Sequence, residues 1–154
     1  MTAPNHALTG AVIGLSVANP WLALPLAFLS HFACDAIPHY DPPGNDKVKR
    51  IGSREFLRDF LVIGAVLCFL LVLCLTLARP EHWLQAAICA FLAASPDLFW
   101  IPRFLHIRRT GKDKPLRSWF LRFHVFIQWK TGPRLIWLEL AWAAVFTGLV
   151  AVHL

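Results

Sequence analysis

Two ionisable residues, His31 and Asp35, interrupt an otherwise apolar segment and lie four positions apart. On a helix this spacing places both side chains on one face. An ionisable group inside a membrane helix costs about 2.5–3.5 kcal/mol on insertion scales, so it usually faces the protein interior and has a partner. A pair of ligands at this spacing can share one metal ion. The pair therefore predicts either a metal site or a buried hydrogen bond that ties helices together.

Two other residues are expected near this pair. His6 begins an apolar segment, and Asp97 follows Ser95-Pro96 close to the end of another. By itself, Asp97 could also be a helix cap after a proline kink. His6, His31, Asp35 and Asp97 are therefore expected at the same end of the bundle, and imidazole and carboxylate groups suit a divalent metal, zinc or manganese.

Cysteine is not expected among the ligands. Each of the four cysteines lies in an apolar run, and none belongs to a CxxC pair: Cys34, Cys68, Cys74 and Cys89. Cysteines in such runs are typical of small buried hydrophobic residues.

Several other polar residues could take part in hydrolysis at such a metal. His39, Asp41 and His124 are candidates for a general base. Three arginines, Arg103, Arg108 and Arg109, could stabilise an anionic phosphate, although membrane topology alone also accounts for basic residues there. The expected reaction is hydrolysis of a lipid or amphiphilic phosphate ester, ahead of an ester or amide. A non-catalytic membrane scaffold and an ion or proton relay remain the alternatives.

The composition indicates which class of protein carries these residues. The chain has 154 residues, 57% of them hydrophobic and only 16% charged, and its mean hydropathy is +0.55. A soluble domain is typically about a quarter charged, and a disordered chain is poor in apolar residues. Both classes are therefore excluded, and the sequence predicts one integral membrane domain over residues 1–154.

The apolar segments predict an all-α, polytopic membrane bundle of about five helices, because a spanning helix needs about 20 mostly apolar residues. The expected helices cover residues 6–18, 21–37, 60–78, 83–101 and 135–152, with a turn at Asn19-Pro20. Residues 115–130 contain many aromatic side chains among basic ones, which is typical of an amphipathic helix lying at the membrane interface.

The basic residues predict the orientation of this bundle. Fourteen of the fifteen lysines and arginines lie in or beside the connections 38–59 and 102–134, and Arg79 lies in the connection between them. Because cytoplasmic loops carry the excess of Lys and Arg, both connections and the N-terminus are assigned to the cytoplasm, in a bacterial inner membrane. Membrane lipid is the expected partner. Nucleic acid is not expected, and homo-oligomerisation is left open.

Three short motifs resemble those of the YdjM-like membrane-bound metal-dependent hydrolases. They are Asn5-His6 before an apolar helix, Leu29-Ser-His-Phe-Ala-Cys-Asp35, and Ser95-Pro-Asp97. The resemblance implies metal-dependent hydrolysis at the membrane, with His6, His31, Asp35 and Asp97 as ligands. His124 is the nearest counterpart of a further histidine in that family's pattern.

Overall fold

The computed structural model describes residues 1–41, 51, 53, 56 and 61–154. Their regular secondary structure is helical. Apart from one isolated bridge between His39 and Thr131, they contain no β-structure. The basic residues 47, 49, 50, 54 and 58 lie outside the described part of the chain. The elements are α1 (Ala3–Ser16), α2 (Pro20–Ala36), α5 (Ile63–Ala78), α6 (Trp83–Ala94), η2 (Ser95–Trp100), α7 (Ile101–Thr110), α8 (Trp119–Ile127), η3 (Pro133–Leu135) and α9 (Ile136–Val152).

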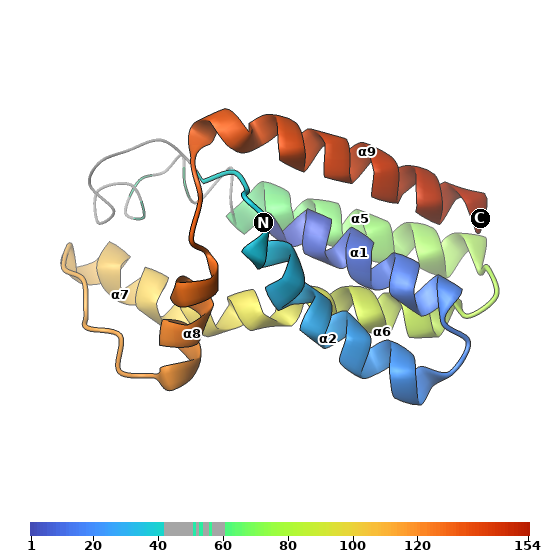
Figure 1. Ribbon diagram of the computed structural model, residues 1–154, viewed down its shortest axis with the longest axis horizontal. Coiled ribbons are helices and arrows are strands. Elements are labelled where there is room, and N and C mark those ends of the chain that lie inside the picture. The colour runs from blue at the N-terminus through green and yellow to red at the C-terminus, as the bar shows by residue number, and fades with distance from the viewer. Residues whose placement is uncertain (42–50, 52, 54–55, 57–60) are drawn as a thin grey trace.

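Helix α1 lies at the centre of the bundle and contacts α2, α5, α6 and α9 (Figure 1). Its tightest contact is with α6, because Gly10 and Gly14 let the two backbones approach closely. A Cβ added at Gly10 would lie 2.2 Å from the carbonyl oxygen of Cys89, and one at Gly14 would lie 2.5 Å from the Cα of Ala86. Small residues at such crossings are typical of helices that pack in membranes.

The turn expected at Asn19-Pro20 is present. Helix α1 ends at Ser16, and the Asn19 side chain accepts a hydrogen bond from the backbone N–H of Trp21 at the start of α2. Pro20 occupies the first position of α2, where its missing N–H costs nothing. This tight connection returns the chain, so that the first residues of α1 and the last turn of α2 lie at the same end of the bundle.

The helix predicted over residues 83–101 differs most from the structure. Its α-helical part ends at Ala94, and Ser95–Trp100 form a 3₁₀ helix that leads directly into α7, so that helical structure continues to Thr110. Pro96, which has no N–H to donate, lies at the start of the 3₁₀ segment. The change in helix type places Asp97 and Trp100 at the end of the bundle where α2 also ends.

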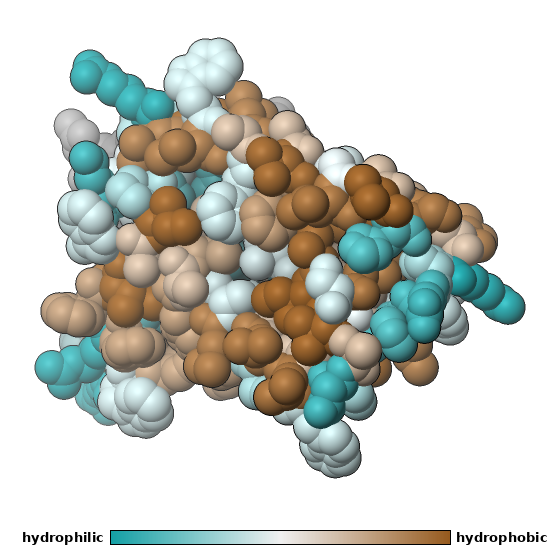
Figure 2. All heavy atoms as spheres, turned by 45° about the vertical axis from the view of Figure 1, so that its right-hand side comes forward, coloured by the Kyte–Doolittle hydropathy of each residue, from teal (hydrophilic) through white to brown (hydrophobic). Residues whose placement is uncertain are grey.

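The outer surfaces of the helices are strongly apolar. Large hydrophobic side chains are exposed on several helices, among them Trp21, Phe69, Leu77 and Trp137. Figure 2 shows apolar side chains over most of one face, with hydrophilic groups toward its edges. Two helices, Trp83–Thr110 and Pro133–Val152, are long and apolar enough to cross a membrane, and Ile63–Ala78 is a shorter apolar helix.

The amphipathic segment predicted at 115–130 contains a shorter helix, α8, over Trp119–Ile127. Helix α8 is not purely a surface element, because it contacts α2 and buries His124 completely. The segment after it pairs with the segment after α2: the His39 N–H donates to the carbonyl of Lys130, and the Gly132 N–H donates to the carbonyl of His39. These contacts close the end of the bundle at which the ionisable residues lie.

Candidate metal centre

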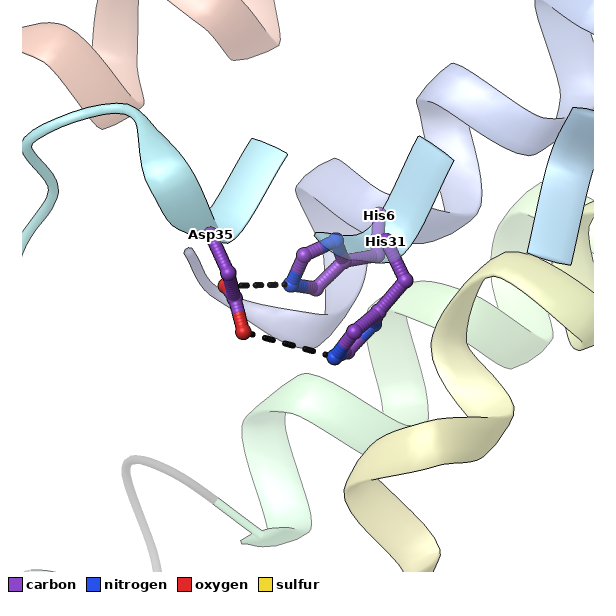
Figure 3. A group of neighbouring side chains, drawn as sticks. All are labelled: His6, His31 and Asp35. Carbon is purple, nitrogen blue, oxygen red and sulfur yellow. Dashed lines mark hydrogen bonds and ion pairs between the residues drawn. The ribbon is translucent and has the colours of Figure 1, made fainter. Parts of the chain in front are cut away.

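His6, His31 and Asp35 meet inside the bundle, at the end where α1 begins and α2 finishes (Figure 3). All three are at most 1% exposed. The imidazole rings of His6 and His31 are stacked, with centroids 3.9 Å apart and an angle of 24° between their planes. The carboxylate of Asp35 lies across the edges of both rings. The prediction that these three residues share one site therefore agrees with their placement.

Asp35 is the centre of the cluster. Its Oδ1 lies 3.1 Å from His6 Nε2 and 2.5 Å from the amino group of Met1. Its Oδ2 lies 2.6 Å from His124 Nε2, 2.8 Å from the amide nitrogen of Gln128 and 3.4 Å from His31 Nε2. A buried carboxylate needs this many partners, because removing an unpaired charge from water is very costly.

His31 has the support that metal-binding histidines usually have. Its Nδ1 lies 2.8 Å from the carbonyl oxygen of Ala93. A carbonyl oxygen can only accept, so the proton of neutral His31 is on Nδ1 and the Nε2 lone pair points into the cluster. His6 is different, because its Nδ1 is buried and has no hydrogen-bond partner. His31 is thus the better-oriented of the two imidazoles.

Asp97 belongs to the same cluster but lies at its edge. Its Oδ1 is 3.8 Å from His31 Nε2 and 3.9 Å from His124 Nε2, and its side chain is 33% exposed. The four residues predicted as ligands therefore come together, with Asp97 farther from the others than they are from one another. Asp97 is also the predicted ligand that borders the neighbouring cavity.

The separations within the cluster suit a small divalent ion. Ligand atoms about 2.0–2.1 Å from a tetrahedral zinc lie about 3.3–3.4 Å from each other. Asp35 Oδ2 is 3.4 Å from His31 Nε2, and Asp35 Oδ1 is 3.1 Å from His6 Nε2. Two overlapping groups could hold an ion: His6–His31–Asp35, and His31–Asp97–His124. Imidazole nitrogens and carboxylate oxygens are ligands of both zinc and manganese.

A cavity of about 620 Å³ adjoins the cluster. Its apolar wall comes from Leu61, from α5 and α6, and from the η2–α7 segment, and it includes Phe91, Leu98 and Phe104. Its polar wall includes His39, Asp41, Asp97, Arg103 and Gln128. A cavity of this size and mixed polarity is typical of a site for a small ligand.

Two of the predicted base residues, His39 and Asp41, line this cavity. His39 Nδ1 lies 2.8 Å from the carbonyl oxygen of Ile37. Because a carbonyl oxygen can only accept, the ring proton is on Nδ1 and Nε2 carries a lone pair. Burial lowers the pKa of His39, so the ring stays neutral at ordinary pH. His124, the third predicted base, lies in the cluster itself and not in the cavity wall.

The three arginines do not come together. Arg103 lines the cavity, and its Cζ lies 5.5 Å from the centroid of the Trp100 ring. It also forms a bidentate ion pair with Asp113. Arg108 and Arg109 lie on exposed positions of the last turn of α7 and are not among the cavity-lining residues. A phosphate in the cavity would therefore meet one arginine whose charge is already paired.

Besides the amino group of Met1, two partners in the cluster were not predicted from the sequence, Trp100 and Gln128. Trp100 donates its indole N–H to His124 Nδ1 at 3.1 Å, and Gln128 donates to Asp35. Neither residue has a spacing signal, because both contacts depend on where α8 docks. Glu139, an ionisable residue near the start of the apolar segment 135–152, is also buried, and it accepts hydrogen bonds from Thr2 and Asn5 that join α9 to α1.

The comparisons with known proteins add no relative: no family model, no curated protein and no solved structure matches this chain.

Proposed function

We propose that this protein is a membrane-embedded, metal-dependent hydrolase whose ion is held by His6, His31 and Asp35, with Asp97 beside them. The observation that carries the proposal is the fully buried convergence of two imidazoles on one carboxylate at separations that suit zinc. The Nδ1–H of His31, which donates to a backbone carbonyl, supports it further. A divalent ion there would act as a Lewis acid and lower the pKa of the water that it binds.

The proposed setting is a bilayer crossed by five helices. The exposed apolar side chains and the two long apolar helices support this setting, and the basic connections support a cytoplasmic N-terminus in a bacterial inner membrane. The cluster then lies at the cytoplasmic end of the bundle, at the depth of the lipid headgroups. An apolar wall beside a polar one suits an amphiphile whose headgroup meets the cluster.

The proposed substrate is a lipid-like ester, with a phosphate ester first and a carboxylic ester or amide next. His39 is the general base, because its neutral ring lines the cavity with an unprotonated Nε2. The positions of Arg108 and Arg109 give no support to a phosphate clamp. The cluster and the cavity support hydrolysis of an ester, and the assay therefore includes both a phosphate ester and a carboxylic ester.

The test uses full-length protein purified in detergent and loaded with zinc or manganese. We expect hydrolysis of a single-chain phosphate ester or carboxylic ester that stops when a chelator removes the metal. Asp35→Ala should lose both metal and activity and still insert into the membrane, whereas His153→Ala, at an exposed position near the C-terminus, should keep both. A variant that loses the metal but hydrolyses at the full rate would rule out the proposal. Purified protein that binds no metal would favour the alternative of a non-catalytic membrane scaffold.

A further inference from the structure

The two groups that could hold an ion share His31 but differ in their other members. One takes His6 and Asp35, and the other takes Asp97 and His124. Distances between heavy atoms alone do not separate them, because His124 Nε2 is only 3.1 Å from His31 Nε2. What faces the second nitrogen of each ring does separate them, since a histidine that binds a metal through Nε2 must carry its proton on Nδ1. The Nδ1 of His6 is buried without a hydrogen-bond partner, so no donor opposes a proton there when Nε2 binds an ion.

The hydrogen bond from Trp100 determines which ring nitrogen of His124 carries the proton. An indole nitrogen is a donor only, and Trp100 Nε1 lies 3.1 Å from His124 Nδ1. His124 Nδ1 must therefore accept, and a proton on that atom would face the indole proton directly. The proton of His124 is thus on Nε2, the nitrogen that points into the cluster. His31 is the reverse case, with its proton on Nδ1 and a lone pair on Nε2.

The distance to Asp35 supports the same assignment. His124 Nε2 lies 2.6 Å from Asp35 Oδ2. Two ligands of one tetrahedral zinc lie about 3.3–3.4 Å apart, whereas 2.6 Å is a short, charge-assisted hydrogen bond with a proton between the atoms. The contact of His31 with the same carboxylate, at 3.4 Å, matches the separation of two ligands, and that of His6, at 3.1 Å, is a hydrogen bond of ordinary length.

The surroundings hold His124 in this orientation. The ring is fully buried, and Phe32, Phe120 and Trp100 pack around it with centroid distances of 6.0, 6.3 and 5.8 Å. A ring enclosed in this way cannot turn over without moving its aromatic neighbours. Because the ring cannot reorient easily, the Trp100 hydrogen bond fixes both the position of the ring and the nitrogen that carries the proton.

We propose that Trp100 is a positioning residue that keeps His124 out of the metal's ligand set, so that the ion belongs to His6, His31 and Asp35 while His124 donates a hydrogen bond to Asp35. This inference rests on the proposed function for the presence of the ion. His124 is then the partner that orients a ligating carboxylate, a role that outer residues commonly have at metal centres. Trp100, three residues after Asp97, is the residue that assigns this role.

The first measurement compares zinc affinity in a matched pair of variants, His31→Gln and His124→Gln, by competition with a chelating dye. Glutamine can donate a hydrogen bond but is a poor zinc ligand. We expect His31→Gln to weaken zinc binding by more than about 100-fold, since loss of an outer partner alone costs about 10–100-fold. His124→Gln keeps a donor for Asp35 and should stay within about threefold of the parent protein. An equal, large loss in both variants would overturn the assignment.

The second measurement reads the tautomer without any metal. Ring-¹⁵N NMR of histidine-labelled protein should show His124 protonated on Nε2, and Trp100→Phe should lower the share of that tautomer, because only the hydrogen bond to Asp35 then favours it. Trp137→Phe, at an exposed position of α9, is the control and should change nothing. A His124 proton on Nδ1 in the parent protein would overturn the role of Trp100. If the parent binds no zinc, the proposed function and the ligand set fail together, and the NMR result still decides the role of Trp100.

Discussion

His31 is the residue at which sequence and structure agree most directly. The spacing to Asp35 predicted a shared helix face, and the two side chains lie 3.4 Å apart inside the bundle. What the spacing could not show is the carbonyl of Ala93, which fixes the tautomer of His31, or the contacts of Trp100 and Gln128. These partners come from other helices, so they follow from helix packing and not from a local pattern.

The different support of the two imidazoles leads to a prediction about metal affinity. His31→Ala removes a ring held by a backbone hydrogen bond, whereas His6→Ala removes one whose Nδ1 has no partner. We therefore expect His31→Ala to weaken zinc binding at least about tenfold more than His6→Ala, because outer-shell support is worth about 10–100-fold in affinity. Titration of the purified variants with zinc measures the difference. Equal losses would show that the hydrogen bond to Ala93 contributes nothing.

Loss of the His39 side chain should lower the rate of hydrolysis without changing zinc binding. It lines the cavity with an unprotonated Nε2 and is not a member of either candidate metal group. His39→Ala should therefore keep its zinc and lose about 10²–10⁴-fold in kcat, the usual contribution of a general base. His106→Ala, in α7 but outside both candidate metal groups and the cavity wall, serves as the control for zinc content and for rate. Full loss of zinc in His39→Ala would instead place this residue among the ligands.

At the scale of elements, the apolar segments predicted most of the helices, and the differences have local causes. The helix predicted over 83–101 changes to a 3₁₀ helix at Ser95-Pro96 and then continues through α7. The predicted interfacial helix is confined to Trp119–Ile127 and turns His124 inward. Amphipathic periodicity shows that a helix has two faces, but it does not show that a histidine on one face completes a cluster on another helix.

The close contact between α1 and α6 gives a prediction about stability. A Cβ at Gly10 would meet the Cys89 carbonyl at 2.2 Å, so Gly10→Ala forces the two helices apart. Overpacking of this kind costs about 1–3 kcal/mol. We expect a clear fall in the thermal unfolding midpoint in detergent and weaker zinc binding, since α1 carries His6.

Gly148→Ala is the matched control for this substitution. It lies in α9, and an added Cβ there has no atom within 4 Å. Alanine is a better helix former than glycine, so this variant should be as stable as the parent or more stable. If both alanine variants unfold at the same temperature, the α1–α6 contact is not the tight crossing described here.

At the scale of the whole molecule, composition predicted one integral membrane domain and the apolar segments predicted an all-α fold. The described residues form an all-α structure that exposes many large hydrophobic side chains. The structure adds the reason for the gathering of ionisable groups: the turn at Asn19-Pro20 returns α2 alongside α1, so His6 and Asp35, 29 residues apart, reach hydrogen-bond distance. The number of membrane crossings and their direction remain predictions from hydropathy and charge.

The orientation prediction can be checked in cells by cysteine labelling, after replacement of the four native cysteines. Lys112→Cys lies in the basic connection after α7, and His153→Cys lies just after α9, at the other end of the chain's last helix. In the proposed topology a membrane-impermeant thiol reagent added outside should label position 153 and leave position 112 unlabelled until the membrane is opened. The reverse pattern would invert the topology, and labelling of both positions would show that the chain does not cross the membrane between residues 112 and 153.

X-ray absorption spectroscopy of the zinc-loaded protein in detergent shows whether the imidazoles and carboxylates of this bundle hold a divalent ion. We expect about one zinc per chain, with nitrogen and oxygen ligands at about 2.0–2.1 Å and at least one imidazole among them. Sulfur ligands at about 2.3 Å would place the ion at cysteines and overturn the proposed site. So would a protein that retains no zinc after dialysis.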